Sequence, residues 1–226
     1  MPNFSIHINS DNSVIVEFSD DISIELTRYI LSAKDIIEQS DISGFIEAVP
    51  AYNSLLVIIE PSHFSADRVI KKLESLLRDV EPLSLTNSQK HIIPVCYHTS
   101  LAPDLEQVAK HNGLTVEKVI EVHTGGEYPV YMLGFLPGFL YLGGLDKKIH
   151  CPRRDDPRSR IEAGSVGIGG DQTGIYPINS PGGWHIIGKT PIALLDISKS
   201  VPAIAKPLDT IQFKAISLEE FKQYEH

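Results

Sequence analysis

The glycines of this chain are concentrated in its second half. Of 16 glycines among 226 residues, only Gly44 precedes Gly113, and the other 15 lie between Gly113 and Gly188. Glycine is favoured where the backbone takes a positive φ or passes close to another segment, because it has no side chain. We therefore expect regular helices and strands in the first half, and turns and close backbone contacts in the second.

Hydrophobic periodicity predicts a small α/β module over residues 1–85. Apolar and polar residues alternate on both sides of a turn at residues 11–13, which is typical of a β-hairpin. Apolar residues then recur every three or four positions over 22–37 and again over 69–80, which indicates two amphipathic helices. Asp20 and Asp21 are suited to capping the first of these helices.

Two further strands are predicted between the helices. Residues 45–49 form one, and the uninterrupted apolar run 55–59 is typical of a central strand that is buried on both faces. The module is thus expected to be a sheet with two helices on one side. The polar segment 82–90 is predicted to be a linker.

Short strands separated by turns predict a β-barrel over residues 91–226. The expected strands are 130–133, 164–170 paired as a hairpin with 173–178, 184–187, 192–195 and 211–213. Ser217 is expected to cap a short final helix. The whole chain is therefore predicted to belong to the α+β class.

Charge and composition exclude several kinds of protein. The net charge is −9, and the segment up to Lys90 carries seven basic and 14 acidic residues, so the chain lacks the basic face that nucleic acids require. Residues 103–111 and 115–123 resemble a helix-turn-helix, but the second segment has one basic and two acidic residues, which favours a packing hairpin. Two cysteines are too few for a disulfide framework. Neither a signal peptide nor a membrane-length apolar run is present, so we expect a cytoplasmic protein with no nucleic-acid or membrane partner.

An arginine-rich loop is the first candidate site. Residues 153–160 contain four arginines and only two aspartates, with prolines at 152 and 157. The guanidinium group forms paired hydrogen bonds with carboxylate or phosphate groups. The loop is therefore a candidate anion site, and the alternative is a solvated loop with internal Arg–Asp pairs.

Two turns beside aromatic residues form the second candidate. Pro137-Gly138 lies among Phe135, Phe139 and Tyr141, which either pack in a core or line a pocket. The segment from Ser180 to Trp184 joins a rigid Pro-Gly-Gly turn to the only tryptophan, and its backbone N–H groups suit an amide or carbonyl ligand. The alternative is a tight hairpin with the indole in the core. A lone amidase is disfavoured, because no nucleophile–base pair is evident.

Several long motifs then occur in one order. They are His123-Thr124, the segment 131–142 (YMLGFLPGFLYL), Pro152-Arg153-Arg154 with Pro157-Arg158, 163–166 (AGSV), Tyr176-Pro177, 180–184 (SPGGW) and 187–191 (IGKTP), preceded by 44–47 and 50–55 in the first half. Together they resemble the family of the bacterial 5-oxoprolinase B subunit, also called allophanate hydrolase subunit 1 or KipI-type proteins. The chain departs from the family pattern at residues 97–102, 161–162 and 208–209, which puts local loop shapes in doubt.

The resemblance implies a small N-terminal α/β sandwich module and a C-terminal cyclophilin-like β-barrel. It also implies one subunit of an enzyme complex that uses ATP to open 5-oxoproline to L-glutamate and that is inactive as a single chain. The implied partners are the 5-oxoprolinase C subunit, in direct contact, and the A subunit, and ATP is a cofactor of the complex. No metal site is expected. The alternative is a KipI-type inhibitor that binds a sensor histidine kinase.

These considerations define the expected site residues. We expect Arg154 and Arg158 to neutralise a phosphate and Tyr176 to orient the amide, as catalytic residues. The expected substrate-binding residues are His123, Phe135, Pro137, Gly138, Tyr141, Arg153, Gln172, Ser180, Pro181, Gly182, Gly183 and Trp184.

Overall fold

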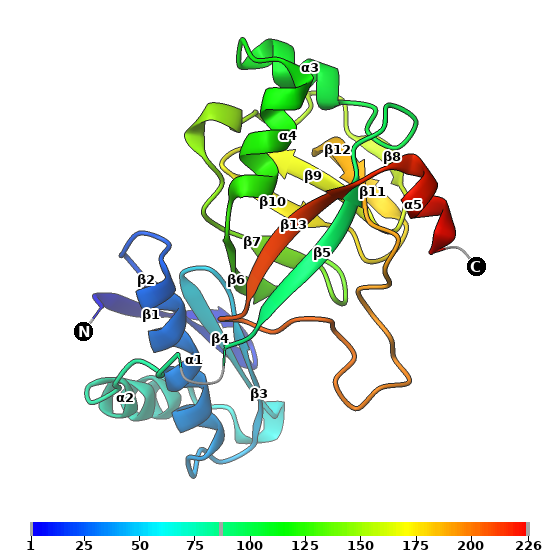
Figure 1. Ribbon diagram of the computed structural model, residues 1–226. Helices are drawn as coiled ribbons and strands as arrows, with labels where there is room; N and C mark the ends of the chain where they lie inside the picture. The colour runs from blue at the N-terminus through cyan, green and yellow to red at the C-terminus, as the bar shows by residue number, and fades with distance from the viewer. Residues whose placement is uncertain (1, 86–87, 225–226) are drawn as a thin grey trace. The chain divides into compact units, whose positions relative to one another are not determined.

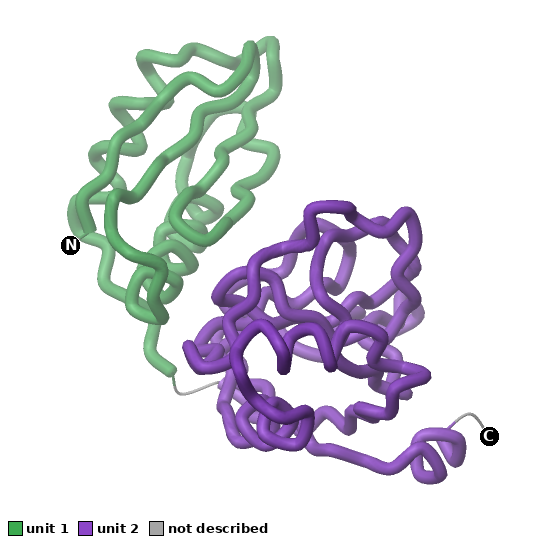
Figure 2. The backbone as a smooth tube through the Cα atoms, turned by 90° about the horizontal axis from the view of Figure 1, so that it is seen from above, with its two compact units in different colours: residues 1–87 green, residues 88–226 purple. Residues whose placement is uncertain are grey.

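The chain divides into two compact units, residues 1–87 and 88–226, coloured separately in Figure 2. The computed structural model describes residues 2–85 and 88–224. The division falls inside the segment 82–90 that was predicted to be a linker, and residues 86–87 of that segment lie outside the described residues. None of the described helices is long and apolar enough to cross a membrane.

The first unit is an antiparallel sheet with two helices packed on one face (Figure 1). Its sheet has the strand order β1-β2-β4-β3. The elements are β1 (Phe4–Ser10), β2 (Ser13–Phe18), α1 (Ile24–Glu38), β3 (Phe45–Pro50), β4 (Ser54–Ile59), the 3-10 turn η1 (Pro61–His63) and α2 (Ala66–Leu77). The predicted order of strands and helices is confirmed.

Two details of this unit differ from expectation. Helix α1 is capped by Ser23, whose hydroxyl accepts a hydrogen bond from the Leu26 amide, and not by the two aspartates before it. Strand β4 is central, but burial alternates along it. Leu55 and Val57 are fully buried whereas Leu56 is half-buried, because the helices cover one face of the sheet.

The second unit is a closed barrel with the strand order β10-β7-β6-β13-β5-β12-β9. Its elements are β5 (Lys90–Cys96), α3 (Leu105–His111), α4 (Val116–Gly125), β6 (Tyr128–Leu133), β7 (Leu140–Leu142), the 3-10 turn η2 (Lys147–Ile149), β8 (Arg158–Ile161), β9 (Ser165–Gly169), β10 (Gln172–Ile175), β11 (Ser180–Gly182), β12 (His185–Lys189), β13 (Thr210–Ile216) and α5 (Leu218–Gln223). The α+β class with a C-terminal barrel is confirmed.

Strand β5 was not predicted, and it lies parallel to β13 over its whole length (Figure 1). Pro94 in the middle of β5 argues against a strand from the sequence. The proline is tolerated because on its other side β5 pairs with β12 only at Cys96. The strand predicted over 192–195 is wrong, since only an isolated bridge between Leu195 and Ala203 forms there.

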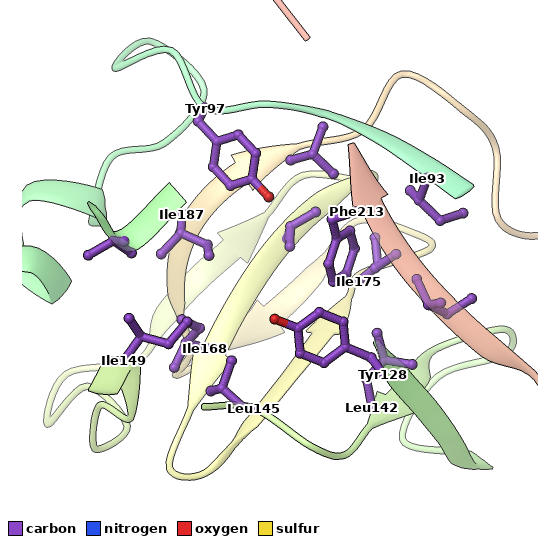
Figure 3. Close-up of a cluster of buried hydrophobic side chains, with 14 of the residues drawn as sticks. Ile93, Tyr97, Tyr128, Leu142, Leu145, Ile149, Ile168, Ile175, Ile187 and Phe213 are labelled. Carbon is purple, nitrogen blue, oxygen red and sulfur yellow. The ribbon is translucent and has the colours of Figure 1, made fainter. Parts of the chain in front are cut away.

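Helices α3 and α4 form the packing hairpin that the sequence predicts. Gly113 in the connecting turn has a φ of +64°, a conformation that favours glycine. Val108 and Val119 are fully buried in the core of the barrel unit. The barrel interior also contains the rings of Tyr97, Tyr128 and Phe213, as Figure 3 shows.

Strands β8 and β11 pair with each other outside the barrel as a two-stranded ribbon. Ser180 lies opposite Ile161, and Gly182 lies opposite Arg158. The amide of Arg154 also donates to the carbonyl of Gly183 over 2.7 Å. This ribbon therefore brings the arginine-rich loop and the Pro-Gly-Gly turn to one place.

Candidate functional site

An aromatic cluster lies beside this ribbon and lines a cavity of about 290 Å³. We call this cavity the aromatic pocket. It is lined by Phe135, Phe139, Tyr141, Arg153, Pro157, Tyr176, Pro181, Gly182, Gly183 and Trp184. The ring of Phe139 stands edge-on to Tyr141, Tyr176 and Trp184, with centroid distances of 4.8, 5.2 and 5.6 Å. Such edge-to-face contacts hold the walls of the pocket in fixed orientations.

Glycines in the neighbouring strands make room for these rings. A Cβ atom at Gly169 would lie 2.4 Å from Nε1 of Trp184, and one at Gly174 would lie 2.9 Å from the same indole. A Cβ atom at Gly182 would lie 2.5 Å from the hydroxyl of Tyr176. The concentration of glycine in the second half is thus explained in part by the close approach of aromatic rings to backbone.

The polar groups of the pocket are two tyrosines and one arginine. Burial raises the pKa of Tyr176 to about 12, although the Trp184 amide and the charge of Arg153 act in the opposite direction. Burial likewise raises the pKa of Tyr141, again opposed by Arg153. Both hydroxyls therefore stay protonated at neutral pH and are able to donate hydrogen bonds. Arg153 is exposed and places a positive charge near both tyrosines.

Phe135 stands at the rim of the pocket in a strained conformation. Its φ is +65°, which is unusual for a residue with a side chain. The side chain is 60% exposed, and its ring lies edge-on to Phe139 and Tyr176. Strained residues of this kind cluster at ligand sites, where the surrounding structure holds them.

The arginine-rich loop is anchored by a residue that sequence reasoning missed. Asp104 is 2% exposed and accepts hydrogen bonds from both Nη atoms of Arg158 at 2.7 Å and from Arg154 at 3.1 Å. It also accepts from the Ile186 amide at 2.7 Å. Burial by itself would raise the pKa of Asp104, but the Arg158 and Ile186 hydrogen bonds and the two arginine charges outweigh it, so the pKa is lowered.

This anchor changes the interpretation of two predicted catalytic residues. The guanidinium group of Arg158 is occupied by Asp104, and neither Arg154 nor Arg158 lines the aromatic pocket. The structure therefore gives Arg158 a structural partner within the chain, and both of its Nη atoms are engaged by Asp104. Instead, the two arginines hold the loop in place, and Arg153 is the arginine of the loop that lines the pocket.

His123 is also placed differently from the prediction. It is 0% exposed inside the barrel, stacked 4.4 Å from the ring of Phe213. It is not among the residues that line the aromatic pocket, so the structure does not group it with the other expected substrate-binding residues. His123 lies four residues after Val119 on the buried side of α4, which packs against β13.

The hydrogen bonds of His123 define its tautomer. Thr173 donates its hydroxyl proton to the Gly167 carbonyl at 3.0 Å, so it accepts from Nε2 of His123 at 3.0 Å. Nδ1 is then the acceptor for the Tyr97 hydroxyl at 2.7 Å. Burial lowers the pKa of His123 to about 3, so this ring is neutral in the folded protein.

The remaining predicted residues do not line the aromatic pocket. Pro137 and Gly138 form the turn before β7, and Gly138 packs against Leu195 with a φ of +78°. Gln172 begins β10 and pairs with Gly169. The buried hydroxyl of Ser180 has no hydrogen-bond partner within residues 2–85 and 88–224.

The structure therefore brings together most of the predicted substrate-binding residues. Those that line the aromatic pocket are Phe135, Tyr141, Arg153, Pro181, Gly182, Gly183 and Trp184, together with Tyr176, which was predicted as a catalytic residue. Phe139 and Pro157 also line it and were not predicted as site residues. The signal for both was present, because Phe139 belongs to the same aromatic segment and Pro157 to the arginine-rich loop.

Comparison with known proteins assigns the chain to a family. Residues 4–205 match the family "Carboxyltransferase domain, subdomain C and D". The chain is 41% identical to the 5-oxoprolinase B subunit of Bacillus subtilis, over 98% of this chain and 96% of that protein. A conserved uncharacterized protein from Pyrococcus horikoshii has a crystal structure that is 43% identical over 96% of this chain and the whole of that one, with a TM-score of 0.58.

A more distant structure shares the fold. The urea carboxylase of Kluyveromyces lactis is 19% identical over 98% of this chain and 22% of that protein, with a TM-score of 0.84. The carboxyltransferase-domain match and the full-length similarity to the B. subtilis protein show that the chain belongs to the family of 5-oxoprolinase B subunits.

Proposed function

We propose that this chain is the B subunit of a 5-oxoprolinase complex that opens 5-oxoproline to L-glutamate with ATP. Relatives named as 5-oxoprolinase B subunits match nearly the whole chain. The observation that supports a substrate-binding role is the aromatic pocket, whose apolar walls enclose about 290 Å³ beside one cation and two protonated tyrosines.

The pocket matches the chemistry of 5-oxoproline. The substrate is a flat five-membered lactam that carries one carboxylate. Aromatic walls favour the ring, Arg153 is suited to pairing with the carboxylate, and the Tyr176 hydroxyl is suited to donating to the lactam oxygen. Because burial keeps Tyr176 protonated, it is able to stabilise negative charge that develops on this oxygen.

ATP supplies what an unactivated amide lacks. In this proposal its terminal phosphoryl group moves to the lactam oxygen as the phosphoanhydride bond breaks. Water adds to the ring carbon, the C–N bond breaks with departure of the amine, and a second water hydrolyses the resulting acyl phosphate. The residues of this chain bind and orient the lactam, and the C and A subunits complete the site.

Two measurements test this proposal. Trp184 is the only tryptophan and lines the aromatic pocket, so we expect 5-oxoproline to change its fluorescence, either in the isolated chain or after addition of the C subunit. In a mixture of the A, B and C subunits we expect glutamate release to depend on both 5-oxoproline and ATP.

A matched pair of variants makes the test specific. Arg153→Ala is expected to raise KM for 5-oxoproline about tenfold, because it removes one charge-assisted hydrogen bond. Arg160→Ala removes an exposed arginine that does not line the pocket and should leave KM unchanged. No glutamate from the assembled complex and no fluorescence response would refute the proposal, and binding to a sensor histidine kinase would then be the function to test.

A further inference from the structure

The aromatic pocket is formed by two walls of different kinds. The first, which we call the ring wall, consists of the aromatic residues Phe135, Phe139, Tyr141, Tyr176 and Trp184. The second, which we call the turn wall, comes from the arginine-rich loop and the Pro-Gly-Gly turn and consists of Arg153, Pro157, Pro181, Gly182 and Gly183. The shape of the pocket therefore depends on what holds the turn wall against the ring wall.

Asp104 is attached to the barrel strand β12 by both its backbone and its side chain. Its amide donates to the carbonyl of Ile186 at 2.9 Å, and its carboxylate accepts from the amide of Ile186 at 2.7 Å. Ile186 is buried in the same cluster as Tyr176 and Trp184. The carboxylate is therefore fixed in relation to the ring wall.

The same carboxylate holds the turn wall through two arginines. Both Nη atoms of Arg158 donate to Asp104, and Arg158 lies opposite Gly182 in the ribbon. Arg154 also donates to Asp104, and its backbone amide donates to the carbonyl of Gly183 at 2.7 Å. The two arginines thus connect one buried carboxylate with both glycines of the turn.

The contact between the two walls leaves little room for movement. A Cβ atom at Gly182 would lie 2.5 Å from the hydroxyl of Tyr176, so the backbone of the turn lies directly against the group that is expected to contact the ligand. Misplacement of a binding group by about 1 Å is enough to reduce binding or catalysis strongly. A shift of the turn wall is therefore expected to displace Tyr176.

Asp104 also determines the charge that a ligand meets. Its carboxylate compensates Arg154 and Arg158, and Arg153 is the cation among the described residues that line the pocket. One arginine is suited to one carboxylate. A second carboxylate on the ligand would lose hydration without gaining a partner, which disfavours it.

We infer that Asp104 is a positioning residue for the aromatic pocket, which holds the Pro-Gly-Gly turn against Tyr176 and restricts the pocket to ligands with one carboxylate. The identity of the ligand as a lactam rests on the proposed function, whereas the preference for one carboxylate over two does not. Arg154 and Arg158 then serve the site through the turn that they hold, without touching the ligand.

Three ligands of different charge test this inference on the full chain, with the C subunit added if the fluorescence response requires it. They are 2-pyrrolidone, which is an uncharged lactam, 5-oxoproline with one carboxylate, and glutarate with two, and Trp184 fluorescence reports their binding. Wild type should bind 5-oxoproline about tenfold more tightly than either of the others. In Asp104→Asn this advantage over glutarate should fall about tenfold, because two guanidinium charges are released. Binding of 5-oxoproline should also weaken, because the turn is displaced.

Further variants separate charge from loss of stability. Asp104→Asn with Arg158→Gln removes one of the released charges and should recover part of the preference for 5-oxoproline, which a merely unstable fold would not do. Asp104→Glu keeps the charge at a shifted position, so it should weaken 5-oxoproline binding and retain the preference; it carries the test if circular dichroism shows that Asp104→Asn is unfolded. Asp171→Asn removes an exposed carboxylate that does not line the pocket and should change neither quantity.

The ring resonances of Tyr176, assigned with Tyr176→Phe, give a measurement that needs no ligand. We expect the substitutions at Asp104 to shift them, while the resonances of Tyr29 in the first unit stay unchanged. Unshifted Tyr176 resonances would overturn the inference, and so would a ratio of glutarate to 5-oxoproline dissociation constants that is the same in Asp104→Asn and wild type. Shifted resonances in a chain that binds none of the three ligands would support the positioning of Tyr176 and count against the proposed function, so the two can fail separately.

Discussion

Replacing Asp104 by asparagine tests whether this buried carboxylate holds the arginine-rich loop in place. The side chain is 3% exposed, and the two arginines that it pairs with are 24% and 28% exposed. Removing one partner of a buried ion pair costs about 3–5 kcal/mol, because it leaves uncompensated charge. We expect about 3 kcal/mol for Asp104→Asn, since both guanidinium groups keep some access to water and the Ile186 amide retains an acceptor.

The assay is urea unfolding followed by the fluorescence of Trp184. This tryptophan lies in the barrel unit, two residues from Ile186, so it reports on that unit. Urea is preferred because guanidinium salts screen ion pairs. In a thermal scan the same loss corresponds to a decrease of roughly 6–12 °C for a chain of this size. Asp171→Asn, at an exposed turn, is the control and should change stability by less than about 0.5 kcal/mol.

The pH dependence gives a second check on the same residue. The folded-state pKa of Asp104 is below its ordinary value. The ionised side chain therefore adds to the free energy of unfolding above about pH 4, which is the pKa in the unfolded chain. This contribution is lost as the pH falls through the folded-state pKa. The difference in the free energy of unfolding between wild type and Asp104→Asn should therefore become smaller below about pH 4. A cost under about 1 kcal/mol at neutral pH, or a gap that does not depend on pH, would refute the reasoning.

Three further predictions concern other buried or strained positions. The pKa of His123 is lowered to about 3 in the fold, so the unfolded chain takes up a proton that the folded chain does not. The free energy of unfolding of wild type should therefore fall by up to about 1.4 kcal/mol per pH unit below pH 6.5. His123→Gln should remove this pH dependence over about pH 4–6 in urea titrations. The same pH dependence in both proteins would contradict the assignment. Gly164 and Gly113 both have positive φ, but a Cβ would lie 2.5 Å from the Thr190 carbonyl oxygen only at Gly164. Gly164→Ala should thus be more destabilising than Gly113→Ala by about 1–3 kcal/mol, and equal costs would show that the clash relaxes. Phe135→Gly should leave the thermal midpoint nearly unchanged, because the release of about 1 kcal/mol of backbone strain offsets the lost packing of a side chain that is 60% exposed. The same change should weaken 5-oxoproline binding. Unchanged affinity would exclude a role for this ring in the pocket.

Much of the architecture could be predicted from neighbouring residues. The alternation in the first hairpin, the helical stripes and the cap at Ser217 depend on residues a few positions apart, and all of them are confirmed. The aromatic pocket was likewise indicated by Phe135, Tyr141 and the turn before Trp184. In each case the signal and the structure that it predicts lie in the same short segment.

Long-range pairing was not predictable in this way. Asp104 lies 50 residues before Arg154 in sequence, and nothing in its local context marks it as the anchor of the loop. Strand β5 pairs in parallel with β13 more than 100 residues later, so the barrel closes through contacts that no local pattern encodes.

The sequence by itself determined the two-part α+β organisation, the turns and the residue types available for a site. Only the tertiary structure decided which charges are free to bind a ligand. Arg153, Arg154 and Arg158 are equivalent in a local pattern, but Asp104 occupies Arg158 and part of Arg154 and leaves Arg153 facing the aromatic pocket. The physical reason is that a charge is compensated by whichever group the fold brings within hydrogen-bonding distance, and that distance depends on closure of the barrel.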